Sequence, residues 1–103
     1  MSEADYGQAA ELLRVLSASV RLAIITHLAD AGPAPVHTLT AALGHPQPLI
    51  SQHLRVLRAA RLITSTAQGR ERVYALVDEH VAHIVADAVR HTSEQVRDPM
   101  PQH

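Results

Sequence analysis

The sequence predicts a mainly α-helical domain with one small β-hairpin, in the order helix-helix-helix-helix-strand-strand-helix. Apolar residues recur at helical spacing along most of the 103 residues. Two strand-like segments, 62–66 and 72–76, flank a short loop that contains a glycine. The only aromatic residues are Tyr6 and Tyr74, so the core must consist of Leu, Ile, Val and Ala, a composition that favours helices.

The first two helices are expected before a loop that contains two prolines. Ala4–Leu16 carries its apolar residues on one face, as an amphipathic helix does. The second helix runs to Asp30, and either Ser17 or Ser19 is expected to cap its start. Residues 31–35 are predicted to form a loop because proline cannot continue a helix.

Two further helices are predicted on either side of a tight turn. The third spans Val36–Leu43 and stops at Gly44, a residue that readily takes the left-handed conformation found at helix ends. The fourth spans Gln47–Ala60, with Pro48 in its first turn, where a missing backbone N–H costs little. Residues 36–60 are therefore expected to form a helix-turn-helix.

The hairpin and the last helix complete the predicted domain. Residues 67–71 are expected to be the hairpin loop, and the last helix starts near Asp78. A hairpin over residues 62–76, placed after a helix-turn-helix, has the position of a wing. The fold class is therefore a winged helix-turn-helix in one domain over residues 1–97, with a frayed tail at 98–103.

The composition excludes several classes of protein. The chain has no cysteine, which excludes disulfides and any soft-metal, arsenite or thiol-redox sensor that works through a thiolate. No apolar run approaches the roughly 18 residues that span a bilayer. Glu3 and Asp5 stand where a secretion signal needs basic residues. We therefore expect a cytoplasmic protein without a membrane partner.

The net charge of −1 conceals an uneven distribution of charge. Neither Asp nor Glu occurs between Ala31 and Arg70, while acidic residues gather towards both ends of the chain. The arginines of this middle region are Arg55, Arg58, Arg61 and Arg70, with Arg72 just after it. A basic middle between acidic flanks is typical of a module that faces DNA.

The fourth helix has one apolar and one polar face. Helical projection places Ile50, Leu54 and Leu57 on the inner side. Arginine suits guanine, glutamine suits adenine, and arginine on a wing suits the minor groove or phosphates. The candidate DNA contacts are Gln47, Ser51, Gln52, Arg55, Arg58, Arg70 and Arg72. Two symmetric copies would read half-sites about one helical turn apart, so the expected partner is palindromic double-stranded operator DNA.

The last helix carries two pairs of possible metal ligands. Asp78 and His80 form one pair, and His91 and Glu94 form the other. His80 and His91 point the same way but lie about 16 Å apart along a helix, so one copy cannot close a site around one ion. Two antiparallel copies can. Two oxygens and two imidazole nitrogens in a closed tetrahedral site suit zinc best, cobalt would bind similarly, and nickel prefers more ligands.

Other residues lie beside these ligand pairs. His83 and Asp87 project near the same stripe, and either could replace a ligand or support one. An apolar seam, expected to pack against a partner helix, runs alongside the stripe. Its members are Val77, Val81, Ile84, Val85 and Ala88.

The segment Pro48–Arg58 (PLISQHLRVLR), together with Leu62-Ile63, Gly69-Arg70 and Val73–Leu76, resembles the ArsR/SmtB family of bacterial metal-sensing repressors. The resemblance extends over roughly residues 12–94, nearly the whole chain. It implies a homodimer formed through the first and last helices. It also implies a repressor that binds its operator without metal and releases it when zinc binds.

The resemblance also bears on single positions. It implies that Asp78 and His80 of one subunit join His91 and Glu94 of the other around the ion. The chain departs from the family pattern at Arg61, where the family usually has Gly after the recognition helix. It departs again where Pro46 replaces the common Ser cap, which leaves that helix start without a side-chain acceptor.

Other functions remain as alternatives at this point. A repressor of this kind could respond to nickel, cobalt or a non-metal inducer. A zinc hydrolase would need an open coordination position and a general base, whereas the expected site is closed, so we predict that the chain is not an enzyme. A winged helix that binds only proteins would not depend on Gln52 or Arg55 for operator retention.

Overall fold

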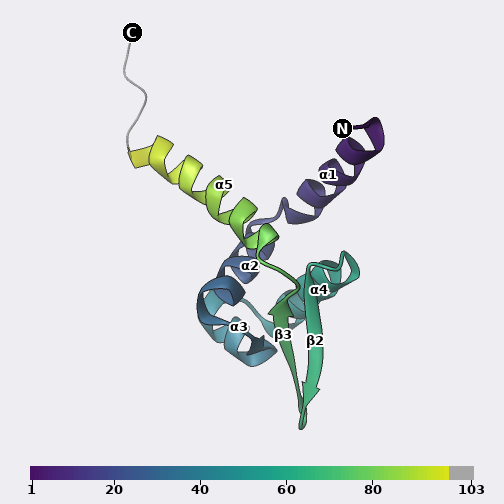
Figure 1. Ribbon diagram of the computed structural model, residues 1–103. Coiled ribbons are helices and arrows are strands. Elements are labelled where there is room, and N and C mark those ends of the chain that lie inside the picture. The colour runs from purple at the N-terminus through teal and green to yellow at the C-terminus, as the bar shows by residue number, and fades with distance from the viewer. Residues whose placement is uncertain (98–103) are drawn as a thin grey trace.

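The computed structural model describes residues 1–97, which form five helices and a three-stranded sheet (Figure 1). The tail expected at residues 98–103 lies outside the described residues. The elements are α1 (Glu3–Leu16), α2 (Ser19–Ala31), β1 (Ala34–Pro35), α3 (Val36–Leu43), α4 (Gln47–Ala59), β2 (Ile63–Gln68), β3 (Glu71–Leu76) and α5 (His80–Arg97). The expected order of helices and hairpin is confirmed.

The sheet has a third strand that the sequence prediction lacks. The strand order is β1-β3-β2, and β1 lies in the segment that was expected to be only a loop. Ala34 pairs with Tyr74 and Pro35 with Val73. Pro35 fits there because β1 is an edge strand, where proline does not interrupt a ladder. A two-residue strand has no periodicity that a sequence pattern could reveal.

The hairpin is tighter than the predicted loop over residues 67–71. Ala67 pairs with Arg72 and Gln68 with Glu71, so only Gly69 and Arg70 remain in the turn. Gly69 has a φ of 63°, the positive value that a two-residue hairpin turn requires. The strands therefore extend through exposed polar residues to the tip of the wing.

The core lies where α2, α3 and α4 meet beneath the sheet. Ile24 and Ile25 of α2 and Leu39 of α3 are fully buried. The inner side of α4 consists of Ile50, Leu54 and Leu57, each at most 1% exposed, which confirms the face assigned by helical projection. Because these residues fix the rotation of α4, its polar side must face outward.

Side chains cap both ends of α1, whereas the start of α2 is not capped as expected. At the start of α1, the Ser2 hydroxyl accepts from the backbone N–H of Asp5 and the Asp5 carboxylate accepts from the N–H of Ser2. The hydroxyl of Ser17 donates to the carbonyl of Arg14, at 2.7 Å, and so caps the end of α1. The prediction that Ser17 or Ser19 caps α2 is wrong. The residue before α2 is Ala18, whose methyl group cannot accept a hydrogen bond.

The end of α4 contains a strained residue. Arg61 has a φ of 64°, the left-handed conformation that favours glycine. The N–H of Arg61 donates to the carbonyl of Arg58, and that of Leu62 to the carbonyl of Leu57. These bonds form a Schellman motif, which explains why the chain turns sharply here although the residue is not glycine.

Helices α1 and α5 extend away from the body, on the side opposite the hairpin tip (Figure 1). The described molecule is accordingly elongated, 59 × 36 × 21 Å. Tyr6 and Leu13 on α1 are 60% and 55% exposed. In residues 1–97 no single helix is long and apolar enough to cross a membrane, although α1 and α2, bent by 93°, pass that test as a pair.

The apolar seam predicted on α5 is divided between two environments. Val81 and Val85 are buried in the chain's own core, because the first turns of α5 pack on α2. Ile84 and Val77 remain 39% and 50% exposed. The expectation that the whole seam faces a partner helix is therefore wrong for the two buried valines. Helical projection gave the apolar face correctly but could not tell which neighbour covers it.

Candidate nucleic-acid interface and metal ligands

The outward side of α4 and the hairpin together enclose two adjacent depressions. One, of about 260 Å³, is lined by Gln47 and Ser51 of α4 and by Arg70 and Arg72 of the hairpin. The other, of about 160 Å³, is lined by Ser51 with Arg55 and Arg58. The structure therefore brings six of the seven candidate DNA contacts to one face. The seventh, Gln52, is exposed on α4 but does not line either depression.

The hairpin holds one of its arginines in place. Arg72 Nε donates to the hydroxyl of Ser65, at 2.6 Å, and Arg72 Nη2 donates to the Ser65 carbonyl, at 3.3 Å. Because both bonds cross from β3 to β2, the guanidinium is held against the hairpin rather than extended freely into solvent. Arg70 lies in the two-residue turn and is exposed.

Three residues at this face were not singled out from the sequence. Tyr74 lines both depressions, and His37 and Glu71 line the larger one. Nδ1 of His37 lies 3.4 Å from Oε1 of Glu71, so the start of α3 contacts the start of β3. The sequence offered a signal for Tyr74, since it is one of only two aromatic residues. The contact between His37 and Glu71 depends on folding.

The first pair of candidate metal ligands lies together at the start of α5. The helix begins at His80, close to the expected start near Asp78, and Asp78 lies in the segment just before it. Oδ1 of Asp78 accepts from the backbone N–H of His80, at 2.9 Å, and lies 3.5 Å from Nδ1 of the same residue. The imidazole of His80 is 90% exposed. The two candidate metal ligands are thus adjacent and accessible.

The second pair lies further along α5. His91 and Glu94 are one helical turn apart and both are exposed. Within residues 1–97, no group of three or more His, Asp or Glu side chains is close enough to hold a metal ion. The two candidate pairs therefore remain apart in the described chain, with two possible ligands each. Their two imidazoles and two carboxylates would suit zinc if a second copy brought one pair against the other.

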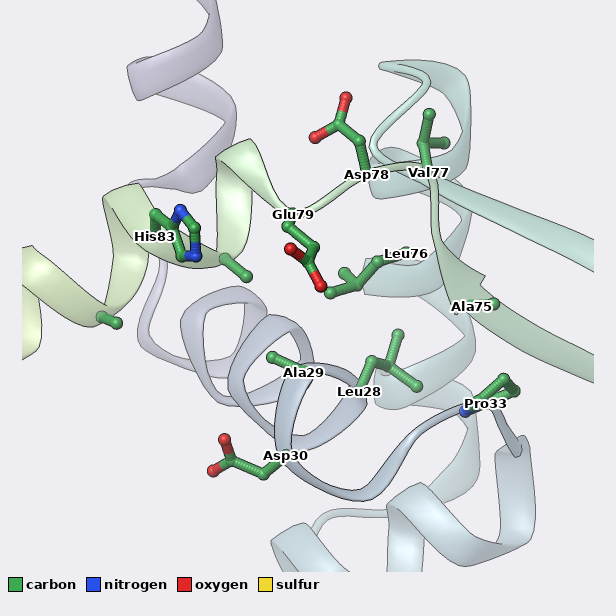
Figure 2. A pocket seen from close by; sticks show the side chains of 12 residues that line it. Leu28, Ala29, Asp30, Pro33, Ala75, Leu76, Val77, Asp78, Glu79 and His83 are labelled. Carbon is green, nitrogen blue, oxygen red and sulfur yellow. The ribbon is translucent and has the colours of Figure 1, made fainter.

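The alternative ligands His83 and Asp87 have neighbours of their own. Asp87 lies 3.4 Å from Nη1 of Arg90. His83 lines a cavity of about 560 Å³ together with Glu79 and Asp30 (Figure 2). In that view the Asp78 carboxylate points away from the side chains of Glu79 and His83. Asp78 also lines this cavity, so His83 shares one part of the surface with the first of the candidate ligands.

Comparison with known proteins places this geometry among bacterial regulators. The family described as "Bacterial regulatory protein, arsR family" matches residues 18–65. The HTH-type transcriptional repressor SmtB of Mycobacterium tuberculosis is 52% identical over 86 residues, which cover 84% of this chain and 63% of that relative. The chain therefore spans less than two thirds of the length of SmtB.

A second relative is similar in both sequence and structure. The HTH-type transcriptional regulator NmtR of Mycobacterium tuberculosis is 41% identical over 85 residues, covering 82% of this chain and 70% of NmtR. The solution structure of apo-NmtR covers 100% of this chain and 86% of its own, at 35% identity and a TM-score of 0.76. A winged helix-turn-helix DNA-binding domain from Mycobacterium bovis, Mb0332, described as homodimeric, has the same fold, with a TM-score of 0.79 at 24% identity over 100% of this chain and 97% of that one.

Proposed function

Because the chain belongs to the arsR family of bacterial regulatory proteins, we propose that it is a homodimeric transcriptional repressor that binds palindromic operator DNA in the apo state and is released when zinc binds at paired α5 helices. The observation that carries the proposal is the gathering of α4 and hairpin side chains around two adjacent depressions. The tip of the hairpin points away from the two projecting helices (Figure 1). Since operator DNA is its target, it would act in the cytoplasm.

The face formed by the outward side of α4 and the hairpin, here called the reading face, carries the hydrogen-bond donors that operator binding needs. Arg55 and Arg58 are exposed on α4 and match the acceptors on guanine in the major groove. Gln47 and Gln52 would read adenine, and Ser51 a phosphate or a base edge. Arg70 and Arg72 on the hairpin would contact the adjacent minor groove or phosphates. Specificity would thus come from α4, and much of the affinity from the hairpin.

The projecting helices support a dimer. Leu13 on α1 and Ile84 on α5 are large apolar side chains left exposed in the single chain. A second copy that packs its own α1 and α5 against them would bury this surface, as symmetric dimers do. The relative Mb0332 is described as homodimeric, which is consistent with this arrangement.

The dimer would also complete the metal sites. Asp78 and His80 of one subunit would hold zinc together with His91 and Glu94 of the partner subunit. Zinc, when bound, would supply a closed tetrahedral link between the two α5 helices. The imidazoles of His80 and His91 must be neutral to act as ligands, so metal affinity should fall as the pH is lowered. A coupling of about 1–3 kcal/mol between metal and operator would change DNA affinity about 5- to 150-fold.

A mobility-shift titration with zinc tests this proposal. The double variant His80→Ala/His91→Ala should bind the operator like the wild type and should no longer respond to zinc. The matched control is His27→Ala, which removes a histidine outside the proposed site and should respond normally. Loss of DNA binding in the double variant would show that α5 is needed for the fold rather than for sensing.

Two alternatives to the proposal concern the identity of the inducer. A response to nickel or cobalt would use the same four residues, and equilibrium dialysis against the three metals separates these cases. A non-metal inducer is the other alternative, and the cavity of about 560 Å³ between α2, β3 and α5 is the feature that favours it. Zinc binding without any effect on operator affinity would support that alternative.

A further inference from the structure

The side chain of Arg21, in the first turn of α2, contacts two other helices. Its Nη1 donates to the carbonyl of Val15 at the end of α1, at 2.8 Å. Its Nε donates to Nδ1 of His53 in the middle of α4, at 3.2 Å. These two nitrogens lie on different edges of the planar guanidinium, so a single side chain can join two separate helices. Among residues 1–97, no carboxylate lies within ion-pair distance of Arg21, so both bonds go to neutral acceptors.

The first of these bonds fixes the end of α1. The last carbonyls of a helix lack partners within the helix, and a positive charge near them is favourable. The Arg14 carbonyl is taken by Ser17, and the Val15 carbonyl by Arg21. The side chains of Val15 and Leu16 are buried, whereas most of α1 is exposed. Arg21 therefore acts at the point where α1 joins the body and helps to set its direction.

The second bond holds the recognition helix. His53 lies between the exposed Gln52 and the buried Leu54. Burial lowers the pKa of His53, and the nearby Arg21 and His45 lower it further, which favours the neutral imidazole that can accept the bond from Arg21. A neutral imidazole that accepts at Nδ1 carries its proton on Nε2. Arg21 thus holds the turn of α4 that carries proposed DNA contacts.

We propose that Arg21 is a positioning residue that sets the direction of α1 relative to α4, and through it the spacing of the two reading helices in the dimer. The inference rests on the proposed function, in which α1 joins the partner and α4 reads a half-site. Within residues 1–97, α1 meets the core mainly through its last turns, where Val15 and Leu16 are buried and Arg21 binds the Val15 carbonyl, so the bond from Arg21 lies where the direction of α1 is set. Two half-sites one helical turn apart are bound together only when the reading helices match that spacing.

The test compares two duplexes. One is a palindromic duplex selected from a random library by the wild-type protein, and the other is the same duplex with one half-site scrambled. Arg21→Gln should lose about tenfold in affinity for the palindrome and little for the single half-site, since each α4 can still bind alone. His53→Leu, which removes the acceptor, should behave in the same way. His53→Asn is the matched control, because its Oδ1 can replace Nδ1 as acceptor.

The outcomes separate the positioning role from the proposed function. A wild-type protein that does not prefer the palindrome would overturn both the dimeric repressor and the role of Arg21. If the wild type prefers it and Arg21→Gln prefers it equally, only the role of Arg21 is wrong. An equal loss on both duplexes would mean that Arg21 merely supports α4, which also overturns the proposal. If Arg21→Gln is unfolded in urea titrations at the assay temperature, Arg21→Lys is used, which keeps the charge but has one nitrogen and should show the same selective loss.

Discussion

The guanidinium of Arg72 is bound to Ser65 across the hairpin, through Nε to the hydroxyl and through Nη2 to the carbonyl. Both residues lie near the larger depression beside α4, of which Arg72 forms part of the lining. A long side chain that is already ordered loses less conformational entropy when it binds a phosphate or a base. If Arg72 contacts DNA as proposed, Ser65 would order its side chain beforehand, although Ser65 is not itself one of the expected contacts.

Replacing Ser65 should weaken DNA binding without changing the charge. Ser65→Ala removes the acceptor of the 2.6 Å bond and should raise the Kd for a selected duplex about three- to tenfold, because Arg72 must then be ordered on binding. Ser65→Thr keeps a hydroxyl and serves as the control. Equal affinities for the alanine variant and the wild type in fluorescence anisotropy would show that Arg72 does not depend on this bond.

Arg61 offers a test of backbone strain. Its φ of 64° costs a non-glycine residue about 1 kcal/mol, so Arg61→Gly should raise the free energy of unfolding by about 0.5–1 kcal/mol in urea. The neighbouring Ala60 has a φ of −82°, which any residue adopts. Ala60→Gly should therefore be destabilising, and stabilisation by both changes would contradict the argument.

The sequence predicted the structure best where an element depends on the spacing of residues that are close together in the chain. The inner stripe of α4 follows from helical spacing, and with it the outward side of that helix. The stop at Gly44 also follows from a local rule, and its φ of 71° confirms it. Membership of the arsR family confirms the resemblance and the winged-helix fold, and with them a regulator rather than an enzyme.

The features that the sequence did not reveal depend on contacts between distant segments. Arg21 and His53 are 32 positions apart, and their hydrogen bond exists only because α2 packs beside α4. The bond from Arg72 to Ser65 requires the register of the hairpin, which a two-residue turn fixes. Likewise, no periodicity could show that Val81 and Val85 pack on α2 rather than on a partner.

Arg55 should be the strongest single test of the reading face. Arg55→Ala is expected to cost about 1–3 kcal/mol of operator binding, about a 5- to 150-fold loss, and to relax specificity at one base pair. Arg14 is an exposed arginine on α1, paired with Glu11, so Arg14→Ala removes the same charge at a position that lines neither depression beside α4. Both variants are measured at protein concentrations above the dimer dissociation constant. Equal losses of affinity would indicate a general charge effect instead of base recognition.

The bond between Arg21 and His53 predicts a dependence of stability on pH. The pKa of His53 in the folded chain lies below its ordinary value of 6.5, first because of burial and then because of Arg21 and His45. The folded state therefore favours neutral His53. Its contribution to stability is complete above pH 6.5 and is lost as the pH falls through the lower folded value.

Urea unfolding as a function of pH checks this sign. The free energy of unfolding of the wild type should fall more steeply below pH 6.5 than that of His53→Asn, which cannot be protonated in this range. The two proteins differ at this position alone, so the difference between the two curves isolates His53. Curves that remain parallel down to about pH 5 would mean that His53 is not held neutral by the fold.

The exposed apolar residues of the projecting helices predict how the dimer would be broken. Ile84 is 39% exposed on α5, beside the buried Val85, so a charge at position 84 would not enter the core of the single chain. Ile84→Glu should therefore leave the fold intact, as judged by circular dichroism, and weaken dimerisation at least tenfold in sedimentation equilibrium, because a carboxylate would be buried without a partner.

The control for this change is Ala41→Glu, which adds the same charge at an exposed position on α3, away from α1 and α5. It should sediment like the wild type. Because operator binding would require two reading helices, Ile84→Glu should also lose its preference for a palindrome over a single half-site. A variant that remains dimeric and keeps that preference would place the interface on a different surface. The two pairs of candidate metal ligands on α5 would then stay apart.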